Sequence, residues 1–175
     1  AEMADLFFAL QSSPKPIVAR VQGAALGGGA GLVAACDIAV AAEGTRFGFP
    51  EVRVGLVPAV ISPFVLARIG ESATRELFLT GERFDAEKAL AIGLVRAVVP
   101  ERGLDAAVDG RVQQLLQAGP RAVAGAKALL REVGGCRPGD VRQETVERIA
   151  GIRASPEGQE GLRAFLEKRR PDWVP

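Results

Sequence analysis

The feature that most restricts the fold is a glycine-rich segment between two short apolar runs. Residues 17–21 alternate weakly and predict a strand, and residues 37–41 form a second run that is apolar on both faces. Between them, residues 23–31 predict a glycine-rich turn and residues 32–36 a short apolar helix. Strands that are apolar on both faces are typical of parallel sheets, which are covered on both sides. The order strand, turn, helix, strand therefore predicts a βαβ unit and an α/β fold.

Helix signals dominate the chain after the second strand. Apolar residues recur at helical spacing, and glycines or prolines follow the ends of the segments. Gly81 and Gly93 suit the position that follows a helix, whereas Asp85 and Ser155 suit the capping position that precedes one. A further helix is expected at the start of the chain, before a proline-containing break. The predicted helices cover residues 1–10, 62–69, 74–80, 85–92, 104–117, 121–132, 140–153 and 156–169, with a strand at 94–99.

The composition changes near Pro100, from strands and a glycine turn to helices. A chain of 175 residues with 48% hydrophobic side chains is long enough to bury a core. We therefore divide the chain into an incomplete core, residues 1–100, and a helical region, residues 101–175. Residues 1–10 resemble the back half of a helix without a preceding cap, so we expect the natural protein to continue upstream of residue 1.

The composition excludes several classes of function. The chain has no histidine, which removes Ser-His-Asp and Cys-His catalysis, histidine zinc sites and a histidine general base. The net charge of +1 gives no general attraction to nucleic acid or acidic membranes, and no apolar run reaches the roughly 18 residues that span a bilayer. Two cysteines, Cys36 and Cys136, make no disulfide framework, so we expect a reducing, cytoplasmic compartment. Chemistry must come from carboxylates, backbone dipoles or a group carried by the substrate.

The glycine-rich segment is the first candidate site. Residues 27–31 (GGGAG) follow a strand and precede a helix, so their N–H groups can bind an anion or polarise a carbonyl oxygen at a positive helix end. The alternative is that these glycines only let a strand and a helix pack closely. The segment does not fit the known phosphate patterns: no Lys-Ser/Thr pair follows Gly28, and Leu32 stands where the dinucleotide fingerprint has its third glycine.

Two charged features are further candidates. Glu51 follows an aromatic segment, residues 47–50 (FGFP), and a carboxylate among apolar side chains is suited to general acid or base catalysis. Taken alone, Pro50-Glu51 favours the other interpretation, the ordinary start of a short, exposed helix. Residues 168–170 (KRR) close the last helix, where cations stabilise a helix C-terminus in solvent, or can bind phosphate.

Taken together, these features resemble the crotonase (enoyl-CoA hydratase/isomerase) superfamily. Residues 15–29 (KPIVARVQGAALGGG) are similar to its signature, and further motifs follow in the same order and spacing to the end of the chain. The resemblance implies a ββα-superhelix core with a C-terminal helical region that assembles homotrimers or hexamers, as dimers of trimers. The further motifs are residues 36–38 (CDI), 46–51 (RFGFPE), 55–58 (GLVP), 79–81 (LTG) with 91–95 (AIGLV), and 164–169 (AFLEKR).

The resemblance also assigns roles to individual residues. In this family a coenzyme A thioester binds with its carbonyl oxygen between two N–H donors; Gly28 matches the second donor, and the first belongs to a segment upstream of residue 1. The family's hydratases use two glutamates on one water; Glu51 matches the second, whereas Gly31 stands at the first. Phe165 and Lys168 match positions where the last helix approaches the adenine end of coenzyme A. The substrate-binding residues that we expect are Ala25, Leu26, Gly27, Gly31, Val54, Pro58, Phe165 and Lys168.

The reaction follows from the same resemblance. Residues 55–63 (GLVPAVISP) are similar to methylglutaconyl-CoA and related hydratases, some of which also lack the first glutamate. A carboxylated substrate can itself help to place the water. We therefore expect hydration of a 2-enoyl-CoA through an enolate, with coenzyme A as part of the substrate and no separate cofactor. Double-bond isomerisation by Glu51 alone is the alternative, and a non-catalytic acyl-CoA binding subunit is the third possibility.

Overall fold

The computed structural model describes residues 2–174, and Ala1 of the predicted first helix lies outside them. The chain forms two compact units. The first contains the residues up to Ser13 together with Ile17–Arg111, and the second contains Pro14–Pro16 with the residues from Val112 onward. The division therefore falls after Arg111, inside a helix, whereas the composition of the sequence changes near Pro100.

Six short strands of the first unit form two three-stranded sheets. The sheet with the order β1-β3-β6 is parallel throughout. In the sheet with the order β2-β4-β5, β2 is parallel and β5 antiparallel to β4. The strands are β1 (Val18–Val21), β2 (Ala24–Leu26), β3 (Ile38–Ala42), β4 (Arg46–Gly48), β5 (Arg83–Asp85) and β6 (Ala97–Val99).

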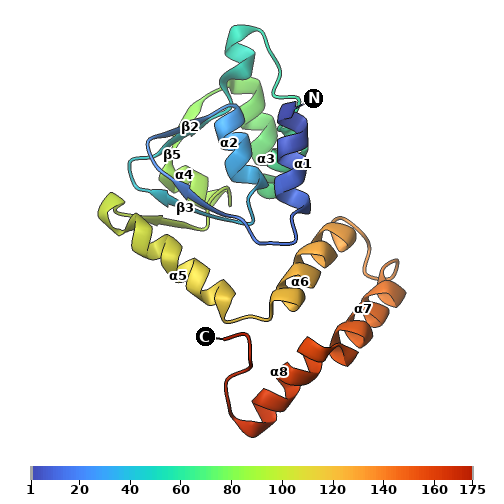
Figure 1. Ribbon diagram of the computed structural model, residues 1–175. Coiled ribbons are helices and arrows are strands. Elements are labelled where there is room, and N and C mark those ends of the chain that lie inside the picture. The colour runs from blue at the N-terminus through green and yellow to red at the C-terminus, as the bar shows by residue number, and fades with distance from the viewer. Residues whose placement is uncertain (1, 175) are drawn as a thin grey trace. The chain divides into compact units, whose positions relative to one another are not determined.

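The chain visits the two sheets in turn, which gives the ββα pattern that the resemblance implies. β1 and β2 precede α2 (Gly28–Ala35), and β3 and β4 precede the 3₁₀ turn η1 (Pro50–Val54) and then α3 (Ser62–Thr80). α2 packs against both α1 (Glu2–Ser12) and α3, and Figure 1 draws these three helices next to one another. The predicted α/β class is confirmed, as is the βαβ unit in which β1 pairs in parallel with β3.

Local capping signals are confirmed where the sequence predicts them. Asp85 accepts an N–H group of the first turn of α4 (Ala86–Ala91) at 2.9 Å. Gly81 ends α3 in the left-handed conformation, with φ 61. Ser155 accepts an N–H group of the first turn of α8 (Pro156–Glu167) at 3.1 Å. Each signal joins residues a few positions apart, so the local sequence is enough to locate it.

Several predictions about the elements are wrong. The glycine-rich segment is not one turn, because β2 lies within it and α2 begins at Gly28 instead of residue 32. β4 and β5 were not predicted, since each is a three-residue strand held by pairing with distant residues. The separate predicted helices 62–69 and 74–80 are, by contrast, confirmed: α3 consists of two helical parts that meet at a kink at Gly70 (φ 76, ψ 172). β6 is shorter than the predicted strand at 94–99.

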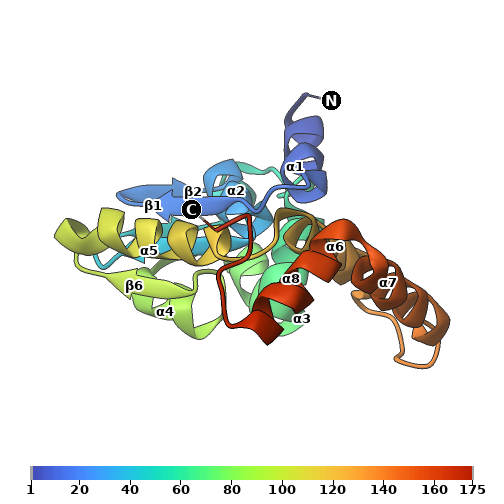
Figure 2. The same ribbon diagram turned by 60° about the horizontal axis from the view of Figure 1, so that its bottom comes forward.

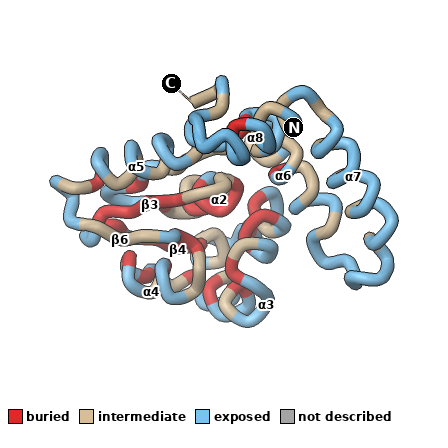
Figure 3. The backbone as a smooth tube through the Cα atoms, turned by 90° about the horizontal axis from the view of Figure 1, so that it is seen from below, coloured by how far each residue is buried: buried red, intermediate tan, exposed pale blue. Residues whose placement is uncertain are grey.

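Aromatic rings fix the part of the first unit that precedes the candidate site. Phe47 stacks on Phe84 with ring centroids 5.8 Å apart, and Phe49 meets Phe78 edge-on at 5.1 Å. Phe47 and Phe49 are fully buried. Figure 3 shows that buried residues gather in α2, β3 and β4. The end of β4, which leads into η1, is therefore anchored in the core.

The helix α5 (Leu104–Leu116) begins in the first unit, after the 3₁₀ turn η2 (Glu101–Gly103). Leu104 is fully buried and packs against side chains of β3 and β6. Arg20 of β1 pairs with Asp105 at 2.5 Å. Figure 2 shows the first turns of this helix alongside the strands. Its first turns therefore cover the parallel sheet.

Three further helices form most of the second unit: α6 (Pro120–Val133), α7 (Arg142–Ala154) and α8. Glu157 in the first turn of α8 accepts the N–H groups of Arg121 and Ala122 at 3.0 and 2.7 Å. One carboxylate therefore caps α6 from a neighbouring helix.

Residues 2–174 contain neither a membrane-spanning helix nor a cluster of metal-binding side chains. No helix there is both long and apolar enough to cross a membrane. No group of three or more His, Cys, Asp or Glu side chains within the same residues is arranged to hold a metal ion.

Candidate active site

The glycine turn joins the end of β2 to the start of α2. Gly27 stands at the N-cap of α2 with φ 53, which glycine adopts without the strain that a β-carbon brings. Its N–H group donates to the carbonyl oxygen of Gly48 at 2.9 Å, which ties the turn to β4. α2 has no side-chain cap. The N–H group of Gly28, the first helical residue, has no acceptor within the helix and is available to an anion or a carbonyl oxygen.

Glu51 lies in η1, next to this turn. The buried ring of Phe49 anchors the segment, and left-handed Gly55 (φ 75) closes it. The Oε1 atom of Glu51 is 3.1 Å from the point that a β-carbon on Gly27 would occupy, so the carboxylate lies against the turn. The Oε2 atom is buried and has no hydrogen-bond partner among the described residues. Because buried polar atoms are normally paired, this oxygen is suited to binding a water or a substrate proton.

The glycine turn and Glu51 line the same pocket, which has a volume of about 590 Å³. Five residues that the sequence predicts for the site share it. They come from the junction of β2 and α2 and from η1, and the end of α3 and the start of β5 complete the wall. The lining residues are Leu26, Gly27, Gly28, Pro50, Glu51, Arg53, Val54, Gly81 and Arg83.

Gly31 does not lie on this pocket, and the space beside it is filled. A β-carbon on Gly31 would lie 2.3 Å from Cγ2 of Ile61 and 3.2 Å from a ring carbon of Phe7. Both of these side chains belong to the buried core. Ile61 therefore fills the space in which a side chain on residue 31 would start. The expected substrate contact of Gly31 stays a prediction.

Two other predicted contacts are also placed away from the pocket. Ala25 is buried in β2, where it pairs with Phe47 of β4. Pro58 is buried in the loop that follows η1. Neither is among the pocket's lining residues. Leu26 and Val54, which the sequence also predicts for the site, do line the pocket.

Phe165 and Lys168 lie at the end of α8, in the second unit. The side chain of Phe165 is 80% exposed. Lys168 ends the helix in the left-handed conformation, with φ 54. Their expected role at the adenine end of coenzyme A stays a prediction.

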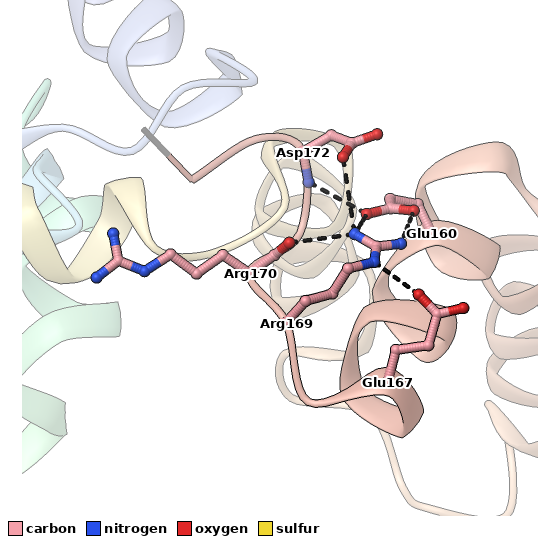
Figure 4. A network of polar contacts seen from close by, with 5 residues as sticks. All are labelled: Glu160, Glu167, Arg169, Arg170 and Asp172. Carbon is pink, nitrogen blue, oxygen red and sulfur yellow. Dashed lines mark hydrogen bonds and ion pairs between the residues drawn. The ribbon is translucent and has the colours of Figure 1, made fainter.

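The cationic segment 168–170 has a structural role at its middle residue, as Figure 4 shows. Arg169 pairs with Glu160 at 2.6 Å and with Glu167 at 2.7 Å, and it lies 3.7 Å from Asp172. Hydrogen bonds from the Arg169 guanidinium are the main reason that the pKa of Glu160 falls from 4.5 to about 2. The same bonds, with those to Glu167, raise the pKa of Arg169. This network favours the structural interpretation of Arg169 over phosphate binding.

The residues predicted for the site do not include four residues of the pocket wall: Pro50, Arg53, Gly81 and Arg83. The signal for Arg53 was its position two residues after Glu51, in the same Pro-Glu turn. Its side chain lies over Gly81, where a β-carbon would be 3.0 Å from the Cγ of Arg53. Arg83 gave no local signal, because β5 is set by its antiparallel pairing with β4.

The chain belongs to the enoyl-CoA hydratase/isomerase family, which it matches over residues 1–174. The crotonase resemblance of the sequence is thereby confirmed, and the ββα architecture agrees with it. The closer likeness to methylglutaconyl-CoA hydratases stays a prediction.

Known relatives agree with this assignment. An enoyl-CoA hydratase from Shewanella pealeana, known from a crystal structure, matches with a TM-score of 0.94 and 46% identity over 98% of this chain and 64% of its own. The 2,3-dehydroadipyl-CoA hydratase of Escherichia coli is 33% identical over 96% of this chain and 66% of its own length. The carnitinyl-CoA dehydratase of Citrobacter koseri is 34% identical over 91% of this chain and 63% of its own length. The chain thus spans less than two thirds of the length of these curated relatives.

Proposed function

We propose that the whole protein acts on acyl-CoA thioesters through an enolate, and that it hydrates a 2-enoyl-CoA. The observation that carries the proposal is the position of Glu51. One of its carboxylate oxygens lies against Gly27, and the other is buried without a partner in the described chain. Gly27, Gly28 and Glu51 all line the same pocket. Relatives that are named as hydratases and dehydratases of CoA thioesters support this class of reaction.

In this proposal the N–H group of Gly28 holds the carbonyl oxygen of the thioester. The dipole is fixed at the start of α2, so it stabilises negative charge that develops on the oxygen without any reorganisation. The loss of one donor of this kind costs roughly 3–4 kcal/mol in comparable sites. The donor matters most in the enolate, where the oxygen carries the most charge.

Glu51 carries the proton in hydration. A water bound to Glu51 adds its oxygen to C3 of the enoyl thioester, while the carboxylate accepts one of the water's protons. The electron pair of the C2–C3 double bond moves into the enolate, whose oxygen lies on Gly28. Glu51 then returns the proton to C2, and the product is a 3-hydroxyacyl thioester. One water is added and no other reactant is consumed.

Isomerisation is a second candidate, and the environment of Gly31 is the observation that favours it. Ile61 and Phe7 occupy the space where a side chain on residue 31 would begin, and Glu51 is the one carboxylate that residues 2–174 supply to the pocket. A single carboxylate is enough to move a proton between carbons. Glu51 would take a proton from C2 of a 3-enoyl thioester and return it to C4, with no water consumed.

Other expectations from the resemblance are part of the same proposal. Coenzyme A enters as part of the substrate, and the reaction needs no separate cofactor. The helical region assembles a homotrimer or hexamer, in which Phe165 and Lys168 approach the adenine end of coenzyme A. The protein works in the cytoplasm.

The experiment follows crotonyl-CoA with the whole protein in water enriched in oxygen-18. Hydration predicts loss of the conjugated thioester absorbance together with one labelled oxygen in the product. A 3-enoyl-CoA that becomes conjugated without gaining the label supports isomerisation instead. Tight binding of both thioesters without any turnover contradicts both enzyme proposals and leaves an acyl-CoA binding subunit.

A further inference from the structure

The pocket beside Glu51 carries more positive than negative charge. Arg53 and Arg83 line it, and Glu51 is the one acidic residue that the described part of the chain contributes to its wall. The remaining lining residues are glycine, proline or aliphatic. Two guanidinium groups therefore border an otherwise apolar pocket.

Neither arginine is neutralised by an acid of the described chain. The Nε atom of Arg53 donates to the carbonyl oxygen of Thr80 at 3.2 Å, which orients the guanidinium and leaves its other N–H groups without a partner in residues 2–174. The side chain of Arg83 makes no hydrogen bond or ion pair within the same residues. Both side chains are exposed, so their donors are open to a ligand.

The two acidic residues nearest to Arg83 in the sequence, Glu82 and Asp85, already bind Lys88. Lys88 binds Glu82 through its Nζ atom at 2.5 Å. The backbone N–H of Lys88 donates to Asp85 at 2.9 Å, which caps α4. Glu82 and Asp85 thus each have a partner other than Arg83.

The register of the second sheet brings Arg83 near the glycine turn. Leu26 pairs with Gly48, and Gly48 pairs with Arg83. Two strand spacings, about 10 Å in all, therefore separate the backbone of Arg83 from the end of β2. Gly27 follows directly and is held by the carbonyl of Gly48 at 2.9 Å. An acyl group whose thioester lies on Gly28 can extend into the space that the arginine side chains border.

We propose that this pocket selects acyl groups that end in a carboxylate, and that Arg53 and Arg83 bind that distal carboxylate. A guanidinium donates two parallel N–H bonds to a carboxylate, and such charge-assisted bonds are stronger than neutral ones. The substrate class is then a dicarboxylic enoyl thioester. This inference rests on the proposed function, because it concerns the substrate of the same site. A phosphate group of coenzyme A can accept hydrogen bonds from the same guanidinium groups, so the experiment has to separate phosphate binding from carboxylate binding.

The test measures binding to the whole protein by calorimetry, with two saturated thioesters that cannot be hydrated. Glutaryl-CoA ends in a carboxylate, whereas valeryl-CoA has the same number of carbons and no charge. We expect glutaryl-CoA to bind at least about tenfold more tightly. Arg53→Gln and Arg83→Gln each bring the ratio of the two affinities closer to one. Arg75→Gln is the matched control, because Arg75 is an exposed arginine paired with Glu71 and is absent from the pocket wall; it leaves the ratio unchanged.

Equal affinity of the unmodified protein for the two thioesters overturns the proposal, whatever the variants do. A second result also overturns it: the arginine variants lose the same affinity for both CoA thioesters but bind valeryl-pantetheine, which lacks the phosphate groups, as tightly as the unmodified protein does. That pattern would show that the arginines bind phosphate. The proposed reaction is tested separately. It is contradicted if neither crotonyl-CoA nor its dicarboxylic analogue glutaconyl-CoA is turned over, and the affinities for the saturated thioesters decide the present inference in either case.

Discussion

The carboxylate of Glu51 lies against the backbone of Gly27, with its Oε1 atom 3.1 Å from the point that a β-carbon there would occupy. The two residues belong to different ββα segments. Gly27 precedes α2 and Glu51 follows β4, and the hydrogen bond from Gly27 to Gly48 holds the two segments together. Any side chain on residue 27 therefore acts directly on the position of the carboxylate.

Gly27→Ala is expected to reduce kcat/KM by about 10- to 100-fold, because the added methyl group pushes the carboxylate of Glu51 away from the turn. The backbone angles of Gly27 (φ 53, ψ −120) also add roughly 1–3 kcal/mol of strain to a residue with a side chain. Gly23→Ala is the matched control, since Gly23 also has a positive φ but has open space where its β-carbon would lie. The control should lose stability and keep its kcat/KM. Equal losses of activity in the two variants would show that strain, and not contact with Glu51, is responsible.

Gly31→Ala is expected to destabilise the fold by about 1–3 kcal/mol, because its β-carbon overlaps Ile61 in the core. The cost should be smaller when it is introduced into an Ile61→Gly background, and urea unfolding of all four proteins gives the coupling energy. Gly29→Ala is the control in the same helix, where nothing lies within 4 Å of the added carbon. We expect it to be neutral or to stabilise by roughly 0.5–1 kcal/mol. If Gly31→Ala lowers the free energy of unfolding equally in both backgrounds, contact with Ile61 does not explain its effect. That result would contradict the conclusion that Ile61 excludes a second carboxylate at residue 31.

Acid is expected to loosen the end of the chain. The pKa of Glu160 is lowered to about 2, so its contribution to stability is present above its ordinary pKa of 4.5 and is lost as the pH falls through about 2. Trp173, the one tryptophan of the sequence, follows Asp172, whose N–H donates to Glu160 at 3.2 Å. Its fluorescence should therefore change between pH 4.5 and 2.

Glu160→Gln should give the acid-type fluorescence of Trp173 already at neutral pH, because the ion pair with Arg169 is lost. Glu71→Gln, which removes an exposed pair on α3, should leave the fluorescence profile unchanged. A Glu160→Gln protein with the same pH profile as the unmodified protein would show that the network of Figure 4 does not hold the chain end.

Local signals explain which parts of the fold could be predicted. The caps at Asp85 and Ser155 and the helix end at Gly81 depend on residues a few positions away, and the parallel pair of β1 and β3 follows from one βαβ unit. β4 and β5 could not be predicted, because Phe47 and Phe84 meet only through pairing between distant segments. Propensity is weak in a three-residue strand, and tertiary contacts decide its structure.

The same division applies to the site. Gly28 and Glu51 could be assigned because they belong to continuous motifs, and the structure places both on one pocket. Arg83 reaches that pocket through β5, and Ile61 closes the space at Gly31 from the start of α3. Neither relationship leaves a pattern in the sequence near the glycine turn. They depend on the packing of segments that are more than 25 residues apart, as Gly31 and Ile61 show.

The most direct test of the account is the turnover of a 2-enoyl-CoA by a Glu51→Gln variant of the whole protein. The amide keeps the size of the side chain but cannot take up a proton, so kcat should fall by at least about 10²-fold, the lower end of general acid–base effects. Circular dichroism should be unchanged, and Glu71→Gln, an exposed glutamate on α3, should keep full activity. A Glu51→Gln protein that retains most of its rate would contradict the account, because another group would then carry the proton.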